Sequence, residues 1–468
     1  MMVNAGKLTR VAAASAVLIL AGGCANYHAK PLHPAAFARR FSQRSLTSTR
    51  LINYVKNEKI KLAKQFPRRW NAASLVCAGW YYSPVLRVQR ARLAVDRANM
   101  VTAAESPNPS VALSPTYAAK AGPGISPWIL GFNFDIPIET AGRREDRMVQ
   151  AKALTLAGRY DLGQIAWNLR KQIRVAIINY LFARKKVGIL AQQAHTTELI
   201  QSLVKSRFKA GDISRPVYAA SEIQARQAAL ALVAAKGLLR QRRIQLAGAM
   251  SLPAAALDDV RLSVSGLLKL QPMGAAAMKR LTRDALLNRM DIQSLLAQYR
   301  AAAAALKLQI ARQYPNIHLG PGYSFNQGAN EFTLGFSMTL PIFNQNQGAI
   351  GAAEARRRII AAELDQKQTM VMTHIRTALS QYQSARQQWR AARAMERRSR
   401  RQARVARQVY KAGAESHLAL AEAIFLRNTF VQTALQARFQ AIAAQENLQD
   451  ILEMPLAPAP ANPKGNHP

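Results

Sequence analysis

Four short segments of the chain alternate apolar and polar residues with a period of two. In segment 128–136 one face collects Trp128, Leu130, Phe132, Phe134 and Ile136, and the other collects Gly131, Asn133 and Asp135. Segment 332–340 repeats the pattern and places Ser337 and Thr339 on its polar face, while segments 111–117 and 317–325 alternate less strictly. Alternation over about nine residues, with aromatics near the ends, is typical of a strand facing lipid on one side. A half-exposed strand of a soluble sheet gives the same pattern.

Two long stretches without proline follow these strand pairs, between Pro137 and Pro216 and between Pro341 and Pro455. In the first stretch, apolar residues recur at steps of four and three: Leu162, Ala166, Leu169, Ile173, Ala176, Tyr180, Ala183, Val187, Leu190 and Ala194. The second stretch repeats the pattern less cleanly: Val371, Ile375, Ala378, Tyr382, Ala385, Trp389, Ala392, Ala403, Ala406 and Tyr410. This spacing predicts coiled-coil packing, and a helix from Arg144 to Phe208 has a length of about 100 Å.

The two halves of the chain repeat each other. Pro109 and Tyr117 recur as Pro315 and Tyr323, and Leu130-Gly131-Phe132 recurs as Leu334-Gly335-Phe336. Phe208-Lys209-Ala210-Gly211 recurs as Tyr410-Lys411-Ala412-Gly413. Each half therefore predicts the order helix, strand, strand, long helix, glycine turn, helix. We place the repeats at residues 24–250 and 276–454, a linker or equatorial segment at 251–275, and a proline-rich tail at 455–468.

The chain is strongly basic, with a formal net charge of +40 at pH 7. Such a charge is typical of proteins that meet polyanions. The lysines and arginines are nevertheless spread along the whole chain, which favours solvated helix faces over a nucleic-acid footprint. Of the two cysteines, Cys24 and Cys77, we interpret the second as a small buried apolar residue, and we expect no disulfide framework.

The N-terminus predicts export. Basic residues at 7 and 10 precede a short apolar run, and small residues then lead into Cys24. The run is too short to span a bilayer, so residues 1–23 resemble a cleaved signal peptide with a bacterial lipobox that ends in an acylated Cys24. Asn26 follows at the position that directs such lipoproteins to the outer membrane. The alternative is an ordinary signal with a chance cysteine. We expect no later transmembrane helix.

The sequence carries no pattern for catalysis. It has no glycine-rich phosphate loop between a strand and a helix, no His-Glu-x-x-His and no nucleophile elbow. Met370, Met372 and His374 suggest a soft-metal site, but Met372 points away from the other two on a helix, and we interpret the methionines as seam packing. We therefore expect no enzymatic activity, no cofactor and no bound metal.

The duplicated order, the Leu-Gly-Phe…Pro-Ile strand ends and the Lys-Ala-Gly turns resemble the TolC-like outer membrane factor family over residues 41–454. The segment Ile136-Pro137-Ile138-Glu139, with Gly142, Arg143, Arg144 and Arg147 after it, looks more like the branch that serves heavy-metal efflux pumps. The resemblance implies a homotrimer in the outer membrane lipid. It also implies two partners, a periplasmic adaptor (membrane fusion protein) and an inner-membrane pump of the RND type. It implies no nucleic-acid partner.

The expected fold is mainly α with a β-barrel part. Four strands cannot close a barrel, because single-chain membrane barrels start at about 8 strands and open edges are not tolerated in lipid. Three copies of four strands give twelve, which closes, and the long helices then continue as a coiled-coil tube into the periplasm.

The resemblance also assigns roles to the turns. Gly211 and Gly413 are expected as left-handed helix stops, and Phe208 to Gly211 and Tyr410 to Gly413 as the tips where adaptors dock. Glu422 matches an acidic pore ring and Tyr410 a closing network. Ala419, Val217 and Glu415 depart from the family pattern, since acids are expected at the first two positions and a base at the third. The alternative interpretation is that Glu422 is a surface residue that pairs with Lys411 or Arg427.

We therefore predict a passive outer-membrane export duct, anchored by lipid. The competing prediction is a basic periplasmic coiled-coil scaffold lipoprotein without a pore. The alternating strands discriminate between the two predictions, because a scaffold without a pore does not require amphipathic strands with aromatic residues near their ends. The transported substrate is not encoded in any motif.

Overall fold

The computed structural model describes residues 27–454, apart from residues 59, 120, 121, 123, 259, 272, 273 and 327. Cys24, the predicted signal peptide and the proline-rich tail lie outside the described residues. The chain divides into two units, Met1–Arg44 and Ser45–Pro468. In the first unit, helix α2 (Pro34–Ser42) starts on a proline, whose fixed φ suits the first helical turn.

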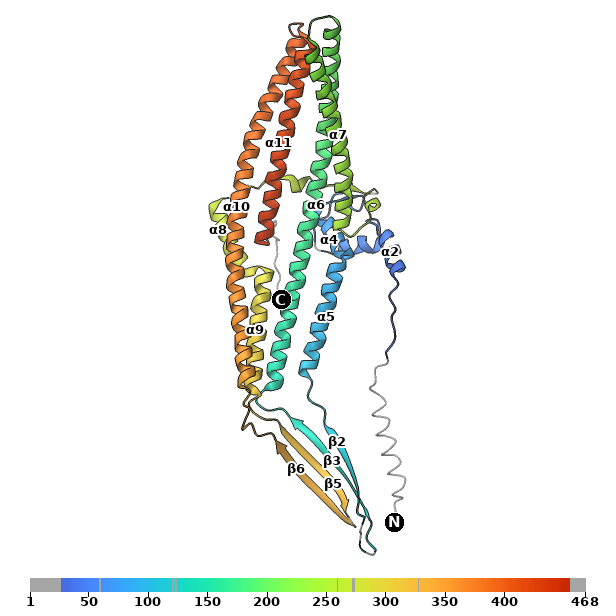
Figure 1. Ribbon diagram of the computed structural model, residues 1–468, viewed down its shortest axis with the longest axis vertical. Helices are drawn as coiled ribbons and strands as arrows, with labels where there is room; N and C mark the ends of the chain where they lie inside the picture. Colours follow the sequence, from blue (N-terminus) through green and yellow to red (C-terminus); the bar gives the residue numbers. More distant parts are fainter. Residues whose placement is uncertain are drawn as a thin grey trace. The chain divides into compact units, whose positions relative to one another are not determined.

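The second unit contains the predicted duplication. Its first copy is α5 (Pro84–Ala104), β2 (Ser110–Tyr117), β3 (Trp128–Ile138), α6 (Arg143–Lys209) and α7 (Arg215–Ala249). Its second copy is α9 (Met290–Ala311), β5 (Ile317–Asn326), β6 (Ala329–Met338), α10 (Gln347–Lys411) and α11 (His417–Leu452). In Figure 1 the strands lie beyond one end of α6 and α10, and the turns into α7 and α11 lie at the other end. The predicted order of elements is therefore confirmed in both halves.

The two long helices have the predicted extent. Helix α6 has 67 residues and α10 has 65, so each spans about 100 Å. The predicted seam of α6 is buried or partly buried along its length, and that of α10 is buried at Val371, Ile375, Ala378 and Tyr382. Met370 and Met372 are 43% and 38% exposed, so the interpretation of these two as seam residues is wrong. Within the described residues, no helix combines the length and apolar character needed to cross a bilayer.

The four predicted strands form one antiparallel sheet in the order β2-β3-β5-β6. The register pairs Phe132 with Leu113 and with Tyr323, and pairs Phe336 with Leu319. The sheet is open within one chain, since β2 bonds only to β3 and β6 bonds only to β5. Strand β6 ends at Met338, so Thr339, predicted as a strand residue, lies just past the end of the sheet.

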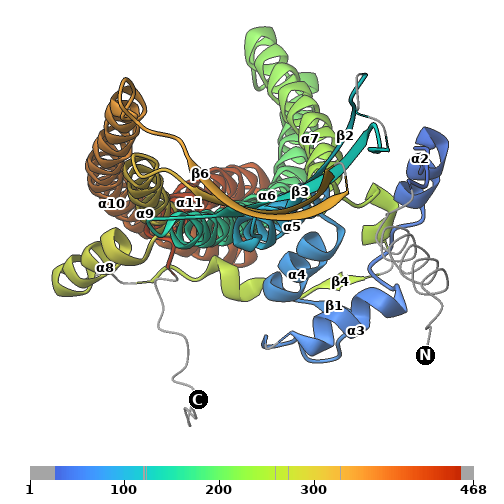
Figure 2. The ribbon, with the colours of Figure 1, turned by 90° about the horizontal axis from the view of Figure 1, so that it is seen from below.

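The core of the second unit lies beside the middle of α6. The segment that joins the two repeats carries η1 (Ala254–Leu257), β4 (Arg261–Leu262) and η2 (Ser265–Leu268), and α8 (Ala275–Asn288) follows it. Strand β4 pairs in parallel with β1 (Arg69–Trp70), which precedes α4 (Ala72–Tyr82) and follows α3 (Thr49–Asn57). Figure 2 shows α3, α4, β1 and β4 gathered on one side of α6.

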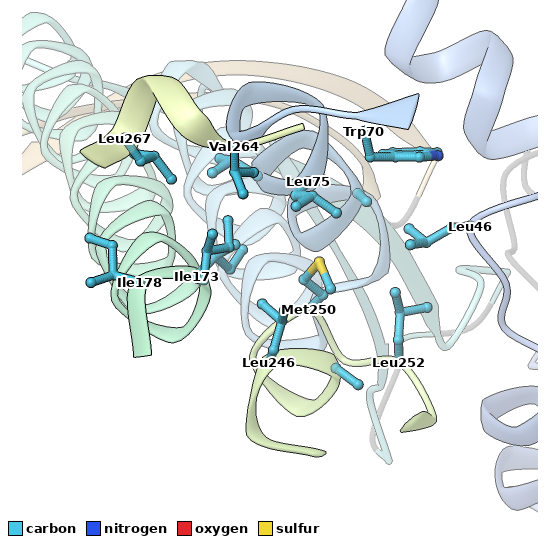
Figure 3. Close-up of a cluster of buried hydrophobic side chains, with 14 of the residues drawn as sticks. Leu46, Trp70, Leu75, Ile173, Ile178, Leu246, Met250, Leu252, Val264 and Leu267 are labelled. Carbon is cyan, nitrogen blue, oxygen red and sulfur yellow. The ribbon is translucent and has the colours of Figure 1, made fainter. Parts of the chain in front are cut away.

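Aliphatic side chains from these segments meet in one cluster. Trp70 is fully buried and donates a hydrogen bond from its indole nitrogen to the Pro67 carbonyl oxygen at 2.9 Å. Leu75, Ile173, Leu246, Met250 and Val264 point toward one another in Figure 3 and are almost fully buried. Cys77 belongs to this cluster, as predicted, and burial raises the pKa of its thiol to about 11. The segment between the two repeats, residues 251–275, is called the join below. It is therefore packed against both α6 and α7.

Candidate functional site

The sheet has one apolar face and one face of small and polar residues. Residues that pair directly across antiparallel strands point to the same side, so the register assigns every face. The apolar face carries Val111, Leu113, Tyr117, Trp128, Leu130, Phe132, Phe134, Ile136, Leu319, Tyr323, Phe332, Leu334 and Phe336. The opposite face carries Ala112, Ser114, Gly131, Asn133, Asp135, His318, Gly320, Gly322, Ser324, Glu331, Thr333 and Ser337. The predicted strand faces agree with this arrangement.

The apolar face is uncovered within the chain. Phe332, Leu334 and Phe336 are 82%, 78% and 78% exposed. Aromatic rings pair across the strands, with 5.0 Å between the centroids of Tyr117 and Trp128 and 5.3 Å between those of Tyr323 and Phe332. A face of this size and composition needs an apolar environment, because burial of apolar surface stabilises by about 25 cal/mol per Å².

The polar face is held by side chains that bridge neighbouring strands. With its amide nitrogen turned toward β5, Asn133 donates to the carbonyl oxygens of Gly320 at 3.1 Å and Pro321 at 3.2 Å. In this orientation a Cβ atom at Gly322 would lie 2.8 Å from the Asn133 amide nitrogen, so a larger residue at position 322 would have to displace the amide from this contact. The ring of His318 lies 2.8 Å from the Asp135 carboxylate, measured from Nδ1 to Oδ1. Three of the four predicted polar residues, Asn133, Asp135 and Ser337, therefore share this face.

Basic residues fix the sheet to the long helices. Arg147 pairs with Glu139 at the end of β3, with 2.9 Å between Nη2 and Oε2. Arg143, the first residue of α6, donates to the Asn316 side-chain oxygen at 2.7 Å and to carbonyl oxygens at the end of α9. Arg143 and Arg147, which follow the Pro-Ile-Glu segment, thus connect the sheet to the helices.

The C-terminal ends of α6 and α10, away from the sheet, have the same backbone geometry. Gly211 and Gly413 have φ of +82° and +77°, which confirms the predicted left-handed stops. The amide nitrogens of Asp212 and Gly211 donate to the carbonyls of Arg207 and Phe208, and those of Ala414 and Gly413 to the carbonyls of Val409 and Tyr410. This is the Schellman pattern, which satisfies the last carbonyl groups of a helix.

The predicted tip residues lie together at these turns. Phe208 stacks on Tyr218 with the ring centroids 5.1 Å apart, and Tyr410 stacks on His417 at 5.2 Å. Lys209, Ala210, Gly211, Lys411, Ala412 and Gly413 are exposed. Ile200, Val204 and Ala421 are buried together and join α6 to α11 close to the turns. One end of the second unit therefore presents both glycine turns.

The three predicted gate residues are not joined into one network. Tyr410 is 37% exposed, and Glu415 and Glu422 are exposed on the surface. Among the residues that the structure describes, Glu422 has no ion pair with Lys411 or Arg427. Arg427 instead donates to the Asn428 side-chain oxygen at 2.8 Å. The surface pairing considered for Glu422 is therefore absent within one chain.

Two opposite sides of helix α11 line two different cavities. Thr429, Thr433 and Gln436 line a cavity of about 880 Å³ with residues of α6, α7 and α10. Val431 and Arg438 line a second cavity, of about 760 Å³, across the helix from the first. Arg438 also donates to the Leu268 carbonyl in η2 at 3.0 Å, so the second side is the one that carries the join. Glu422 stands seven residues before Thr429 and so lies on the side away from the join.

A cluster of partly buried ion pairs holds α6 against α11. The guanidinium of Arg174 donates two hydrogen bonds to the carboxylate of Glu446, at 2.6 and 2.7 Å, and Lys171 donates to Asp450 at 2.6 Å. Burial, with repulsion from Arg174, lowers the pKa of the neighbouring Arg170 to about 10. The sequence signal is present, because Lys171 and Arg174 are three residues apart in α6 and Glu446 and Asp450 are four residues apart in α11. Their pairing was missed because it depends on how the two helices align.

Among the described residues, no group of three His, Cys, Asp or Glu side chains is close enough to hold a metal ion. What the chain presents is a two-faced sheet, two paired helical hairpins and a glycine-turn tip.

The comparison with protein families decides the assignment. The family model described as outer membrane efflux protein matches residues 82–251 and 281–452, which cover both repeats. The chain belongs to the outer membrane efflux protein family. The two matched stretches span α5 to α7 and most of α8 to α11, and they leave α3 and β1 outside.

Known members and solved structures resemble this member of the family. The cobalt-zinc-cadmium resistance protein CzcC of Cupriavidus metallidurans is 23% identical over 221 residues, 47% of this chain and 51% of that protein. The chain thus matches about half the length of this relative. The outer-membrane channel OprN superposes with a TM-score of 0.66 at 17% identity, over 92% of this chain and 99% of that one. The MtrE outer membrane channel of Neisseria gonorrhoeae, in its open state, gives a TM-score of 0.64 at 18% identity, over 83% and 89%. The fold is that of TolC-like outer-membrane channels.

Proposed function

We propose that three copies of this chain form an outer-membrane channel that serves as the passive exit duct of a tripartite export system. The observation that carries the proposal is the uncovered apolar face of a sheet whose edge strands, β2 and β6, each lack a second neighbour. In lipid, unpaired backbone groups cost several kcal/mol each, so the edges must pair between copies. Membership of the outer membrane efflux protein family supports the same conclusion.

The polar face of the sheet then lines the passage. Asn133, Asp135 and Ser337 face the lumen in this arrangement, beside glycines and small hydroxyl residues that leave the passage wide. The helices α6, α7, α10 and α11 continue the wall into the periplasm as a tube. A pore-less scaffold explains neither the apolar face nor its aromatic pairs, so it is the weaker candidate.

The remaining parts of the proposal concern the lipid anchor, the partners and the exported substrate. The acyl chains on Cys24 anchor the mature chain in the outer membrane. The exposed turns at 208–211 and 410–413 receive a periplasmic adaptor, which connects the duct to an inner-membrane pump of the RND type. The likeness to CzcC supports metal cations as the exported substrate. The duct itself makes and breaks no bonds, because the pump supplies the energy.

Glu422 is the proposed acidic ring at the narrow end of the duct. Its side of α11 is opposite the side that carries the join, and the join packs against α3 and α4 on the outside of the helical layer in this arrangement. Three carboxylates around a threefold axis concentrate negative charge, so they attract cations, multivalent ones most strongly.

Planar-bilayer recordings test the channel and the ring together. Wild type should give discrete conductance steps and cation selectivity, with block by trivalent cations added from the periplasmic side. Glu422→Gln should keep the steps, weaken the selectivity and relieve the block. Glu396→Gln is the matched control, because Glu396 lines the cavity on the join side. Unchanged block in Glu422→Gln would place Glu422 outside the passage, and the absence of any steps in wild type would contradict the channel.

A further inference from the structure

The C-terminal part of α10, which ends at the glycine turn, carries a straight row of positive charges. From Arg386 to the end of the helix, cations recur at steps of four and three: Arg386, Arg390, Arg393, Arg397, Arg400, Arg404, Arg407 and Lys411. We call this row the basic stripe. At about 1.5 Å per residue it is about 38 Å long, and it ends at the glycine turn. Six of the eight members directly follow a residue of the predicted seam, so the stripe flanks the contact between α10 and α11.

The stripe lies on the side of the helical layer that carries the join. Arg393 lines the cavity of about 760 Å³ with Lys185 of α6 and Arg438 of α11. Arg438 reaches the η2 carbonyl of Leu268 from the same side. Gln388 and Ala392, by contrast, line the cavity on the other side, where Glu422 lies. The stripe and the proposed acidic ring therefore occupy opposite faces, and the stripe is on the outer one.

The charge of the stripe is almost uncompensated. In the described part of the chain, its one ion pair joins Arg400 to Glu396 at 2.8 Å within the same helix. Neighbouring elements add cations, since burial together with Arg400 and Arg407 lowers the pKa of Arg427, and burial together with Arg438 and Arg184 lowers that of Lys185. Like charges three and four residues apart weaken a helix. A row of this kind is stabilised when carboxylates approach it from another molecule.

We infer that the basic stripe is a docking surface for an acidic α-helix of a periplasmic partner, lying along α10 with carboxylates at heptad spacing. This inference rests on the proposed function, since it assumes that the join side of the tube faces the periplasm. A helix is the occupant that fits, because its own side chains recur at the same four-three steps over the same length. Charge complementarity would then set the register and speed the encounter.

A lipid surface fits the stripe less well. The stripe follows the long axis of α10 as a single row, whereas a membrane surface requires a broad basic patch in one plane. A flexible polyanion could also follow the row, but its binding would not depend on the spacing of the charges. Spacing is therefore the property that the experiment varies.

The test uses two helix-forming peptides of identical composition as probes. In one, glutamates recur at steps of four and three on one face. In the other, the same glutamates are distributed around the helix. Binding of each labelled peptide to the detergent-solubilised full-length trimer is measured by fluorescence anisotropy at low and high salt. The striped peptide should bind at least tenfold more tightly than the distributed one, and salt should weaken its binding.

Two variants locate the binding. In the stripe variant Arg393, Arg400 and Arg407 are each replaced by Gln, and the affinity for the striped peptide should fall at least tenfold. In the control variant the exposed α7 residues Arg226, Lys236 and Arg240 are replaced by Gln, which removes the same charge. The control should bind as wild type does.

Three results would overturn the inference: equal binding of the two peptides, equal binding by the two variants, or displacement of the striped peptide by heparin as readily as by itself. The first and third would make the surface a general polyanion site. Bilayer conductance of the stripe variant separates this inference from the proposed channel. The steps should persist in that variant, whereas their absence from wild type would contradict the channel and not the stripe.

Discussion

Phe336 and Ser337 are neighbours in β6 but face opposite sides of the sheet. Phe336 is 78% exposed on the apolar face, and Ser337 pairs with His318 on the polar face. An arginine at a lipid midplane costs about 2–4 kcal/mol, whereas one in a wet lumen costs little. Phe336→Arg should therefore deplete the assembled trimer in outer-membrane fractions, and Ser337→Arg should assemble and change the conductance. Equal recovery of the two variants from the membrane would mean that the faces are reversed or that neither meets lipid.

The two cysteines give a direct test of the lipid anchor. Cys77 is 1% exposed, and its raised pKa keeps the thiol protonated at neutral pH. Titration with a thiol reagent should therefore find no reactive thiol in the native mature protein and one per chain after denaturation, since acylation at Cys24 consumes the other. Two thiols after denaturation would contradict acylation. A Cys77→Ala variant, which should give none in either state, is the control.

At the residue scale, the sequence predicted the features that depend on the periodicity of neighbouring residues. The alternation assigned both faces of β3, because side chains in a strand must alternate. Thr339 was placed in a strand that in fact ends at Met338, because hydrogen bonding ends before the pattern does. The Arg174–Glu446 pair joins residues on two helices that are far apart in the sequence, and no local pattern states how those helices align.

At the scale of elements, the long helices and their turns were predictable and the short segments were not. Proline-free heptads define α6 and α10, and a glycine in the left-handed region ends each of them. Strands β1 and β4 have two residues each, and neither has a period of its own. They exist because Trp70, Leu75 and Val264 are buried together, which is a tertiary contact.

The turn glycines and a mid-helix glycine should respond to alanine in opposite directions. Gly413 has φ of +77°, where a Cβ costs about 1–2 kcal/mol. Gly188 lies inside α6 with open space around its Cα, so alanine should stabilise the helix there by roughly 0.5–1 kcal/mol. Thermal unfolding of the solubilised protein, followed by circular dichroism, should show a lower midpoint for Gly413→Ala and a higher one for Gly188→Ala. A shift of the same sign in both would show that backbone conformation does not decide stability at these sites.

At the scale of the whole molecule, the duplication is the feature that the sequence states most clearly. Ordered anchors in both strands and both turns predicted two copies of one unit, and the structure contains them as α5 to α7 and α9 to α11. The packing of the join against α4, α6 and α7 lies outside the repeat, although α8 packs against α10 and α11 in a similar way in the second half. It could not be predicted from the pattern, because it involves the part of the chain that was not duplicated.

The open sheet predicts the number of chains. Light scattering of the detergent-solubilised protein, with the detergent mass subtracted, should give three times the mass of one mature chain. Variants that block an edge should shift this mass toward one chain, for example Pro substituted for Leu113 in β2, because proline cannot donate a ladder hydrogen bond. The same substitution at Val217, in the exposed first turn of α7, is the control and should leave the trimer intact. A wild-type monomer that conducts would refute the argument from edges.

The unpaired edges of β2 and β6 also bear on how the protein is made. Helical hairpins form from contacts near in sequence and can fold on each chain alone, whereas the sheet is complete only after three chains have met. The encounter is higher than first order in chain concentration, so slow synthesis should lengthen the time that each sheet stays open. During that time the edges are templates for any other extended chain. A cell that makes this protein therefore has to deliver new chains faster than stray strands reach them, or shield the edges on the way to the membrane.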